Sequence, residues 1–206
     1  MKSKVERTVN KREESTKEYI NALQDKYAKL NVVRVDLAYQ KPYSDDITLD
    51  DANKHFNRML NNRRSNNIFD DNIGYVCKKE YTEDKGVHFH TVFFYNGNKI
   101  KNDVLKAKQI GEYWNDTITD EKGSYHNCNL NADEIYGEKN AVGMLHHSDT
   151  NRREKLDKAI SYLCKEDEEQ NLNSVKSNSK DRAFVRGIMP KKKNNKGRPR
   201  DTTKYC

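Results

Sequence analysis

Alternating apolar and polar residues predict strands in the first half of the chain. In 31–39, NVVRVDLAY, apolar residues recur at every second position, whereas Arg34 and Asp36 fall on the opposite face. Two further strands are expected over 72–81 and 87–95. The residues between them, TEDKG, are typical of a turn, so these two strands are expected to form a hairpin.

Apolar residues spaced three and four apart predict helices between these strands. The segment 1–17 is almost wholly polar and is expected to be loose, and a first helix follows it. Thr48 and Asp51 form a capping box that begins a second helix. Helical spacing also predicts helices over 102–116 and 151–169.

Short segments over 124–130 and 141–147 are expected to add strands, which gives about five in all. Strands gathered into hairpins, with helices between them, are typical of an α+β fold. We therefore expect an antiparallel sheet covered by helices on one face. The domain should span 18–175 and be followed by a linker-like, basic and disordered tail over 176–206.

The composition limits what the chain can do. Its 206 residues, 33% hydrophobic and 34% charged, suffice for one compact domain and leave no room for a second catalytic domain. The net charge of +7 resides in the tail, because 176–206 holds 11 Lys or Arg against 2 Asp. A basic tail on a nearly neutral body favours a polyanionic partner, nucleic acid above all. The alternative is a solvated tail that only aids solubility.

The cysteines and the lack of long apolar segments indicate the compartment. No stretch is apolar enough to span a membrane, and the start of the chain has no apolar signal region, so we expect a cytoplasmic protein without a membrane partner. Cys77, Cys128, Cys164 and Cys206 are far apart and lack C-x-x-C spacing. Reduced thiols are therefore expected, with Cys77 and Cys164 in the core.

The third strand carries the first candidate chemistry. His88 and His90 project from one face of VHFHTVFFY, and in the predicted hairpin Glu80 lies close to the position opposite His88. Two imidazoles and one carboxylate can hold a divalent cation such as manganese, iron, cobalt or zinc, and suit magnesium less well. The alternative is a pair of hydrogen-bonded histidines on a wet sheet face.

The last predicted helix carries the second set of residues with candidate chemistry. In SYLCK, Tyr162 and Lys165 are three residues apart and lie off the apolar stripe of the helix. A tyrosine hydroxyl beside a cation and a lysine can attack a phosphodiester. The alternative is an ordinary surface tyrosine on an amphipathic helix.

Together these motifs resemble a known family. HFH, with a carboxylate upstream and a helical Y-x-x-K downstream, is similar to the HUH endonucleases. The order RVDLAY, YVCKKE, VHFHTVFF, YW and SYLCKE more closely resembles the replication-initiator-like proteins of filamentous phages (inoviruses), over about 32–167. The resemblance implies an antiparallel sheet of RRM-like topology with the histidines on a central strand.

The resemblance also implies an activity. Such proteins nick one DNA strand at an origin, keep the 5′ end as a phosphotyrosine and later rejoin the ends, in rolling-circle replication or the mobilisation of a phage, plasmid or related element. The implied partners are single-stranded or hairpin origin DNA, a host helicase and a polymerase. The implied roles fall on His88 and His90 with Glu80 as metal ligands, manganese or magnesium as the metal, Tyr162 as the nucleophile and Lys165 as its helper.

Asp36 matches an acidic position of the family whose role stays open between metal ligand, orienting group and structure. Some phage initiators use two tyrosines, whereas this motif has one, and no Walker-type motif is present for a helicase motor. In the tail, KGRPR (196–200) resembles an AT-hook. The residues expected to contact DNA there are Lys191, Lys192, Lys193, Lys196, Arg198 and Arg200.

Two other functions fit the same residues. One is a DNA-binding protein of this fold that has lost its nuclease activity. The other is a metal hydrolase that acts through a bound hydroxide and needs no tyrosine.

Overall fold

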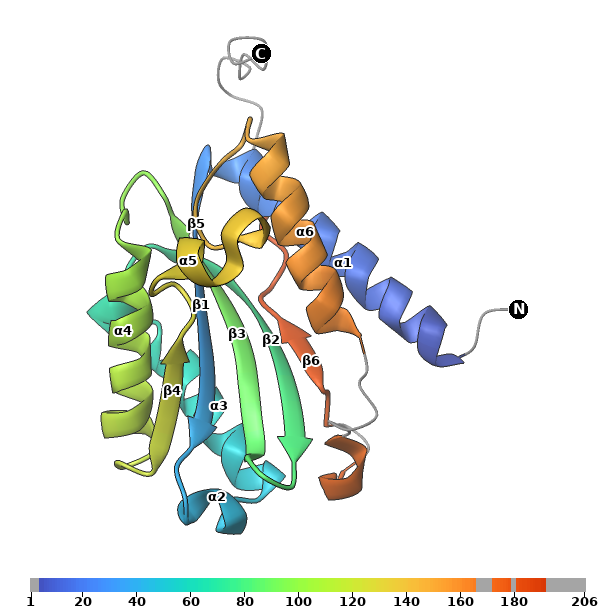
Figure 1. Ribbon diagram of the computed structural model, residues 1–206, viewed down its shortest axis with the longest axis vertical. Helices are drawn as coiled ribbons and strands as arrows, with labels where there is room; N and C mark the ends of the chain where they lie inside the picture. The colour runs from blue at the N-terminus through green and yellow to red at the C-terminus, as the bar shows by residue number, and fades with distance from the viewer. Residues whose placement is uncertain (1–3, 166–171, 179–180, 192–206) are drawn as a thin grey trace.

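An antiparallel sheet forms the centre of the fold in the computed structural model, which describes residues 4–165, 172–178 and 181–191 (Figure 1). Six strands pair in the order β4-β1-β3-β2-β6, and β5 also pairs with β1. The strands are β1 (Lys29–Tyr39), β2 (Asn72–Thr82), β3 (Gly86–Asn96), β4 (Gly123–Asn127), β5 (Gly143–His146) and β6 (Phe184–Arg186). The three long strands and their hairpin agree with the sequence prediction.

Helices connect and flank these strands. They are α1 (Lys4–Lys26), α2 (Tyr43–Asp46), α3 (Leu49–Asn62), α4 (Asp103–Tyr113), α5 (Ala132–Tyr136) and α6 (Thr150–Cys164). α4 continues into a π-helical turn over Trp114–Ile118, and 3-10 turns cover Asn67–Phe69, Gly137–Lys139 and Leu172–Val175. The predicted cap is present, because the side chain of Thr48 accepts a hydrogen bond from the Asp51 N–H. The fold is α+β, as predicted.

The outer edge of β1 is shared by two short strands. β4 pairs with the C-terminal half of β1, and β5 pairs with its N-terminal end. Between them the Asn129 side chain accepts from the Arg34 N–H and donates to the Val32 carbonyl. The amide group thus takes the place of a strand partner and satisfies the backbone at the point where β4 ends.

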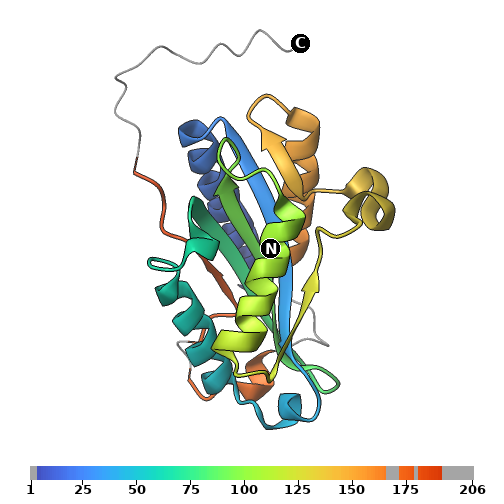
Figure 2. The same ribbon diagram turned by 90° about the vertical axis from the view of Figure 1, so that its left-hand side faces the viewer.

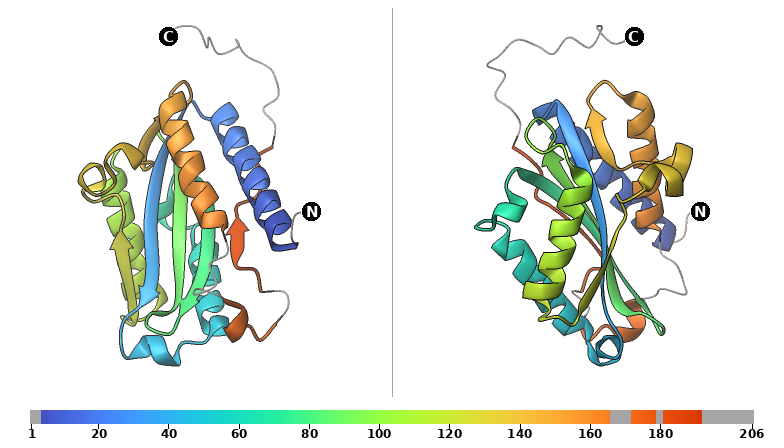
Figure 3. Two further views of the ribbon diagram at one scale, coloured as in Figure 1. Left: turned by 45° about the vertical axis from the view of Figure 1, so that its right-hand side comes forward. Right: turned by 60° about the vertical axis from the view of Figure 1, so that its left-hand side comes forward.

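Helices pack on both faces of the sheet (Figure 2). α3 and α4 cover one face, where the stacked rings of Phe56 and Phe89 have centroids 5.0 Å apart. α1 and α6 cover part of the other face, against Val76, Val92 and Phe94 (Figure 3). The prediction of one covered face was wrong, because this second face is apolar at the end beneath α1 and α6 and charged at the other end, instead of polar throughout.

The N-terminal segment is also more ordered than predicted, since α1 begins at Lys4. Polar contacts, which carry no apolar pattern, hold the part of α1 that was expected to be loose. The Ser161 hydroxyl donates to Glu13 at 2.6 Å, and the Arg186 guanidinium donates to Ser15 at 2.8 Å. Glu13 also pairs with Lys17 one turn along the helix.

Part of the predicted tail belongs to the domain. β6, which lies within the predicted tail, pairs with β2 and matches Cys77 with Val185. Leu172, near the end of the predicted domain, is buried against the core of the α3 and α4 face. The prediction of a disordered tail from residue 176 was therefore wrong for β6. Its three residues are too few to give a periodic signal. Among the described helices, none combines the length and the apolar character needed to cross a membrane.

The β2–β3 hairpin is fixed by its turn. Gly86 adopts a φ of +66°, a conformation that glycine tolerates without steric cost. A Cβ atom at this position would lie 2.5 Å from the Ser44 carbonyl oxygen on α2. The close approach anchors the end of the hairpin to α2, two residues before His88.

Candidate metal centre

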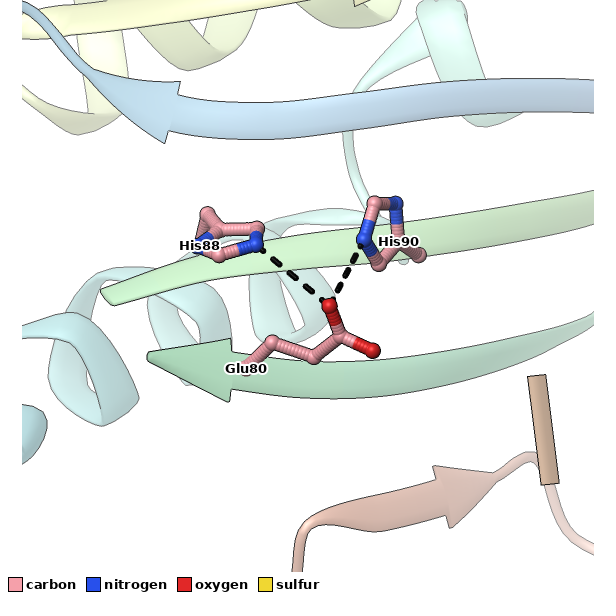
Figure 4. A group of neighbouring side chains, drawn as sticks. All are labelled: Glu80, His88 and His90. Atoms are coloured by element: carbon pink, nitrogen blue, oxygen red, sulfur yellow. Dashed lines mark hydrogen bonds and ion pairs between the residues drawn. The ribbon is translucent and has the colours of Figure 1, made fainter. Parts of the chain in front are cut away.

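Three side chains of the β2–β3 hairpin converge on the partly covered face of the sheet (Figure 4). His88 and His90 project from β3 because residues two apart share a face. Glu80 on β2 pairs directly with His88, as predicted. The cluster therefore follows from strand alternation and hairpin register alone.

The donor atoms of this cluster lie close together. Glu80 Oε2 is 3.5 Å from His88 Nε2 and 3.1 Å from His90 Nε2. All three ligand atoms lie within 4.8 Å of one another, and no other such group occurs in the part of the chain described by the structure. Two imidazole nitrogens and one carboxylate oxygen aimed at one point form a set that can hold a divalent metal ion.

Each histidine is oriented through its Nδ1 atom, the ring nitrogen that does not face Glu80. His88 Nδ1 lies 3.0 Å from the Gly86 carbonyl oxygen, which can only accept, so Nδ1 carries the proton and Nε2 faces Glu80. His90 Nδ1 lies 2.9 Å from Asp36 Oδ2. Asp36 is in turn held by Arg34, whose Nε and Nη2 each lie 3.3 Å from its carboxylate. These contacts favour the orienting role among those left open for Asp36.

Lys78 completes the cluster and was missed in the sequence. Its Nζ lies 2.5 Å from Glu80 Oε1, and the side chains of Lys78 and Glu80 are 9% and 3% exposed. One carboxylate oxygen thus faces the lysine and the other faces the histidines. The sequence could have predicted this contact, because Lys78 precedes Glu80 by two residues and so lies on the same strand face, as Arg34 lies on the same face as Asp36.

The charges of the cluster reinforce one another. Burial opposes the charge on His90, but the carboxylates of Asp36 and Glu80 outweigh burial and raise the pKa of His90 to about 9. Burial likewise opposes the charge on Glu80, yet its side-chain contacts with His88, His90 and Lys78 hold the pKa of this carboxyl far below its usual range. Without a metal, Glu80 and His90 are therefore both charged at neutral pH, with a proton on each nitrogen of His90.

Tyr162 lies on the same side of the sheet but stands apart from the cluster. It occupies the last turn of α6, which crosses this face of the sheet (Figure 3), and it is 63% exposed. Its hydroxyl forms no hydrogen bond with any residue that the structure describes. Tyr162 lines a cavity together with Arg34 and Val92, and Val92 is two residues from His90 on β3.

Lys165 lies just beyond the end of α6. It is the C-cap residue, its backbone is extended, and its N–H donates to the Tyr162 carbonyl at 3.2 Å. The helix predicted over 151–169 ends at Cys164, so Lys165 adjoins Tyr162 across the helix end instead of along the helix surface. At the other end of α6 the Asp149 side chain caps the helix by accepting from the Arg152 N–H.

The other predicted residues divide between the core and the tail. Cys77, Cys128 and Cys164 are buried and unpaired, which agrees with reduced thiols. Lys191 is exposed at the end of the described chain. The remaining tail residues, and KGRPR with them, lie outside the described residues: Lys192, Lys193, Lys196, Arg198, Arg200 and Cys206.

Comparison with known proteins gives one match. The family model described as the YagK/YfjJ C-terminal domain matches residues 2–184. No curated protein and no solved structure matches the chain. The matched region includes strands β1 to β5, the Glu80, His88 and His90 cluster, and Tyr162. Because the match spans most of the chain, this protein belongs to the YagK/YfjJ C-terminal domain family.

Proposed function

We propose that this protein is a metal-dependent DNA endonuclease and strand transferase. It cuts one strand of DNA at a specific site through a 5′-phosphotyrosine intermediate and can rejoin the ends. We propose that this activity serves the start of rolling-circle replication or the mobilisation of a phage, plasmid or related element, and the resemblance to phage replication initiators supports this role. Origin DNA, in single-stranded or hairpin form, is the proposed substrate.

In the proposed reaction the Tyr162 oxygen attacks the phosphorus of a phosphodiester. A bond forms between this oxygen and phosphorus, and the bond from phosphorus to the 3′ oxygen breaks. The phenolic proton is lost to solvent, and the 3′ oxygen leaves as a hydroxyl after gaining a proton. Lys165, whose backbone N–H binds the Tyr162 carbonyl, is proposed to offset with its ammonium group the charge that develops on the phosphate. The reverse transfer restores the strand and needs no external energy source.

His88, His90 and Glu80 would hold the divalent metal, for which manganese and magnesium are proposed. A bound divalent ion supplies Lewis-acid polarisation of the phosphoryl oxygens. Asp36 and Lys78 keep His90 and Glu80 in orientation for this task.

One observation supports the proposal most strongly. A three-residue cluster that can hold a metal and the exposed Tyr162 occur on the same partly covered face of one sheet. Arg34 lies between these two parts of the face. It lines the cavity beside Tyr162, and it holds the Asp36 carboxylate that orients His90. A buried metal cluster needed only for stability would not require an accessible nucleophile nearby.

The test is a denaturing gel with labelled single-stranded oligonucleotides tiled across the DNA that flanks the coding sequence. We expect an adduct that survives denaturation, requires manganese or magnesium, disappears in EDTA and is absent for Tyr162→Phe. Tyr125→Phe is the matched control, because it removes a hydroxyl from a tyrosine that packs against α4 on the opposite face of the sheet. Adduct formation by Tyr162→Phe would overturn the assignment.

The metal hydrolase stays a second candidate because no described residue joins the Tyr162 hydroxyl to the metal cluster. A hydrolase that acts through metal-bound hydroxide predicts cleavage without an adduct and full retention of cleavage in Tyr162→Phe. The same gel therefore separates the two reactions. A relative that has lost its nuclease activity would bind the strands and give neither product.

A further inference from the structure

A cavity of about 910 Å³ opens between α6, the segment 136–142 and the sheet face that carries the metal cluster. Its floor is apolar, with Val32 and Val92 from the sheet and Leu156 and Ile160 from α6. Figures 1 and 2 show α5 and α6 on the same side of the sheet. Its volume falls within the range of sites that bind small organic groups.

The walls of this cavity add aromatic and cationic groups. Tyr136 and Tyr162 line it from α5 and α6. Its other charged residues are four cations and two carboxylates: Arg34, Lys139, Lys155, Lys158, Glu138 and Glu154. The three lysines form no ion pair with any side chain in the described ranges. An apolar floor under a net positive rim suits a ligand that combines a flat apolar group with negative charge.

The cavity adjoins the metal centre. Arg34 lines the cavity and binds Asp36, and Asp36 lies 2.9 Å from His90. Val92 lines the cavity and follows His90 on the same face of β3. A strand whose base enters the cavity would thus carry its neighbouring phosphates past Tyr162 and toward the cluster.

We propose that this cavity receives one unpaired base of a single-stranded DNA and so fixes the strand relative to Tyr162. The identity of the ligand rests on the proposed function. A base offers two apolar faces for the floor and the tyrosine rings, and its phosphates match the lysines. A base inside a duplex would first have to leave its stack, so the cavity favours single strands.

The test is fluorescence anisotropy in EDTA, where no cleavage occurs. The probes are a labelled thymidine oligonucleotide of about 15 nucleotides, long enough to fill one single-strand site, and an abasic strand of equal length. Ala159→Phe, on the α6 wall, fills the cavity, and Tyr136→Ala removes one ring as a second, independent variant. Asn61→Phe, exposed on α3 against the opposite face of the sheet, is the control for an added ring.

We expect wild-type protein and Asn61→Phe to bind the thymidine strand roughly tenfold or more tightly than the abasic strand, as stacking of a base provides. Ala159→Phe and Tyr136→Ala should bind both strands alike, at the weak affinity of the abasic strand. If both variants fold and still prefer the thymidine strand by the wild-type factor, the cavity is not the base site. If the wild-type protein shows this preference but forms no adduct in the denaturing gel, the proposed nuclease activity is overturned and the proposed base site is not.

Discussion

The ion pair between Lys78 and Glu80 gives the most direct test of how the metal centre is built. Replacing Lys78 by Met keeps the length and the apolar stem of the side chain but removes its charge. Both partners are nearly inaccessible to solvent and lie 2.5 Å apart. Loss of one partner leaves a buried carboxylate without its nearest cation, which typically costs about 3–5 kcal/mol.

Because His90 also contacts Glu80 in this cluster, we expect the lower end of that range, a loss of about 3 kcal/mol in the free energy of unfolding. For a domain of this size the melting temperature should fall by roughly 6–12 °C. Urea unfolding near neutral pH in EDTA measures the loss. Saturating manganese should narrow the difference from wild type, since a bound cation would replace the missing charge beside Glu80.

The neighbouring lysine supplies the control. Lys79 points to the opposite face of β2, where its Nζ donates to Asn53 at 2.5 Å and forms no ion pair with the residues described. Lys79→Met should therefore cost only about 1 kcal/mol, the value of one hydrogen bond. If Lys78→Met is no less stable than Lys79→Met in EDTA, Lys78 does not support Glu80 as inferred.

Three further predictions concern the same site. The pKa of His90 in the folded protein, about 9, exceeds the value of about 6.5 in an unfolded chain, so its contacts stabilise the fold below about pH 6.5 and this stabilisation is lost as the pH rises through 9. In EDTA, urea unfolding of the wild-type protein should show the free energy of unfolding fall by about 3 kcal/mol over that pH range, and His90→Gln should lack this fall. Identical pH profiles for the two proteins would contradict the prediction. Asp36→Asn should weaken manganese binding by about 10–100-fold in calorimetry, because His90 loses its orienting carboxylate, and an unchanged affinity would exclude that role. Gly86→Ala should destabilise the protein by about 1–3 kcal/mol and weaken manganese binding, because the Cβ meets the Ser44 carbonyl at a φ of +66°; thermal unfolding and calorimetry check this, and wild-type values would show that the turn adapts.

The sequence sufficed for the parts of the fold that have a clear period. Alternation predicted β1 and the hairpin, and hairpin register alone placed Glu80 opposite His88. Prediction from the sequence failed where stability comes from polar contacts or from very short elements. The part of α1 before residue 18 is held by Glu13 and Ser15, which carry no apolar pattern, and β6 has only three residues.

The candidate site was predictable in its metal ligands and less so in its surroundings. Lys78 and Arg34 could have been expected from their spacing to Glu80 and Asp36, since residues two apart share a strand face. The end of α6 could not be predicted, because the sequence does not reveal the backbone contacts that decide whether the helix continues through Lys165. The cavity beside Tyr162 joins segments distant in sequence, and no periodic pattern predicts it.

The central claim is that Tyr162 becomes covalently bound to DNA, and mass spectrometry of the adduct tests it most directly. Wild-type protein would be incubated with origin-flanking single strands and manganese, treated with nuclease, and digested with trypsin, which cuts after Lys158 and Lys165. The account predicts a nucleotide attached through phosphate to the tyrosine of the peptide AISYLCK, and no such peptide in EDTA. Protein that binds manganese and the strands yet yields only unmodified peptide, or cleaved DNA linked to another residue, would contradict it.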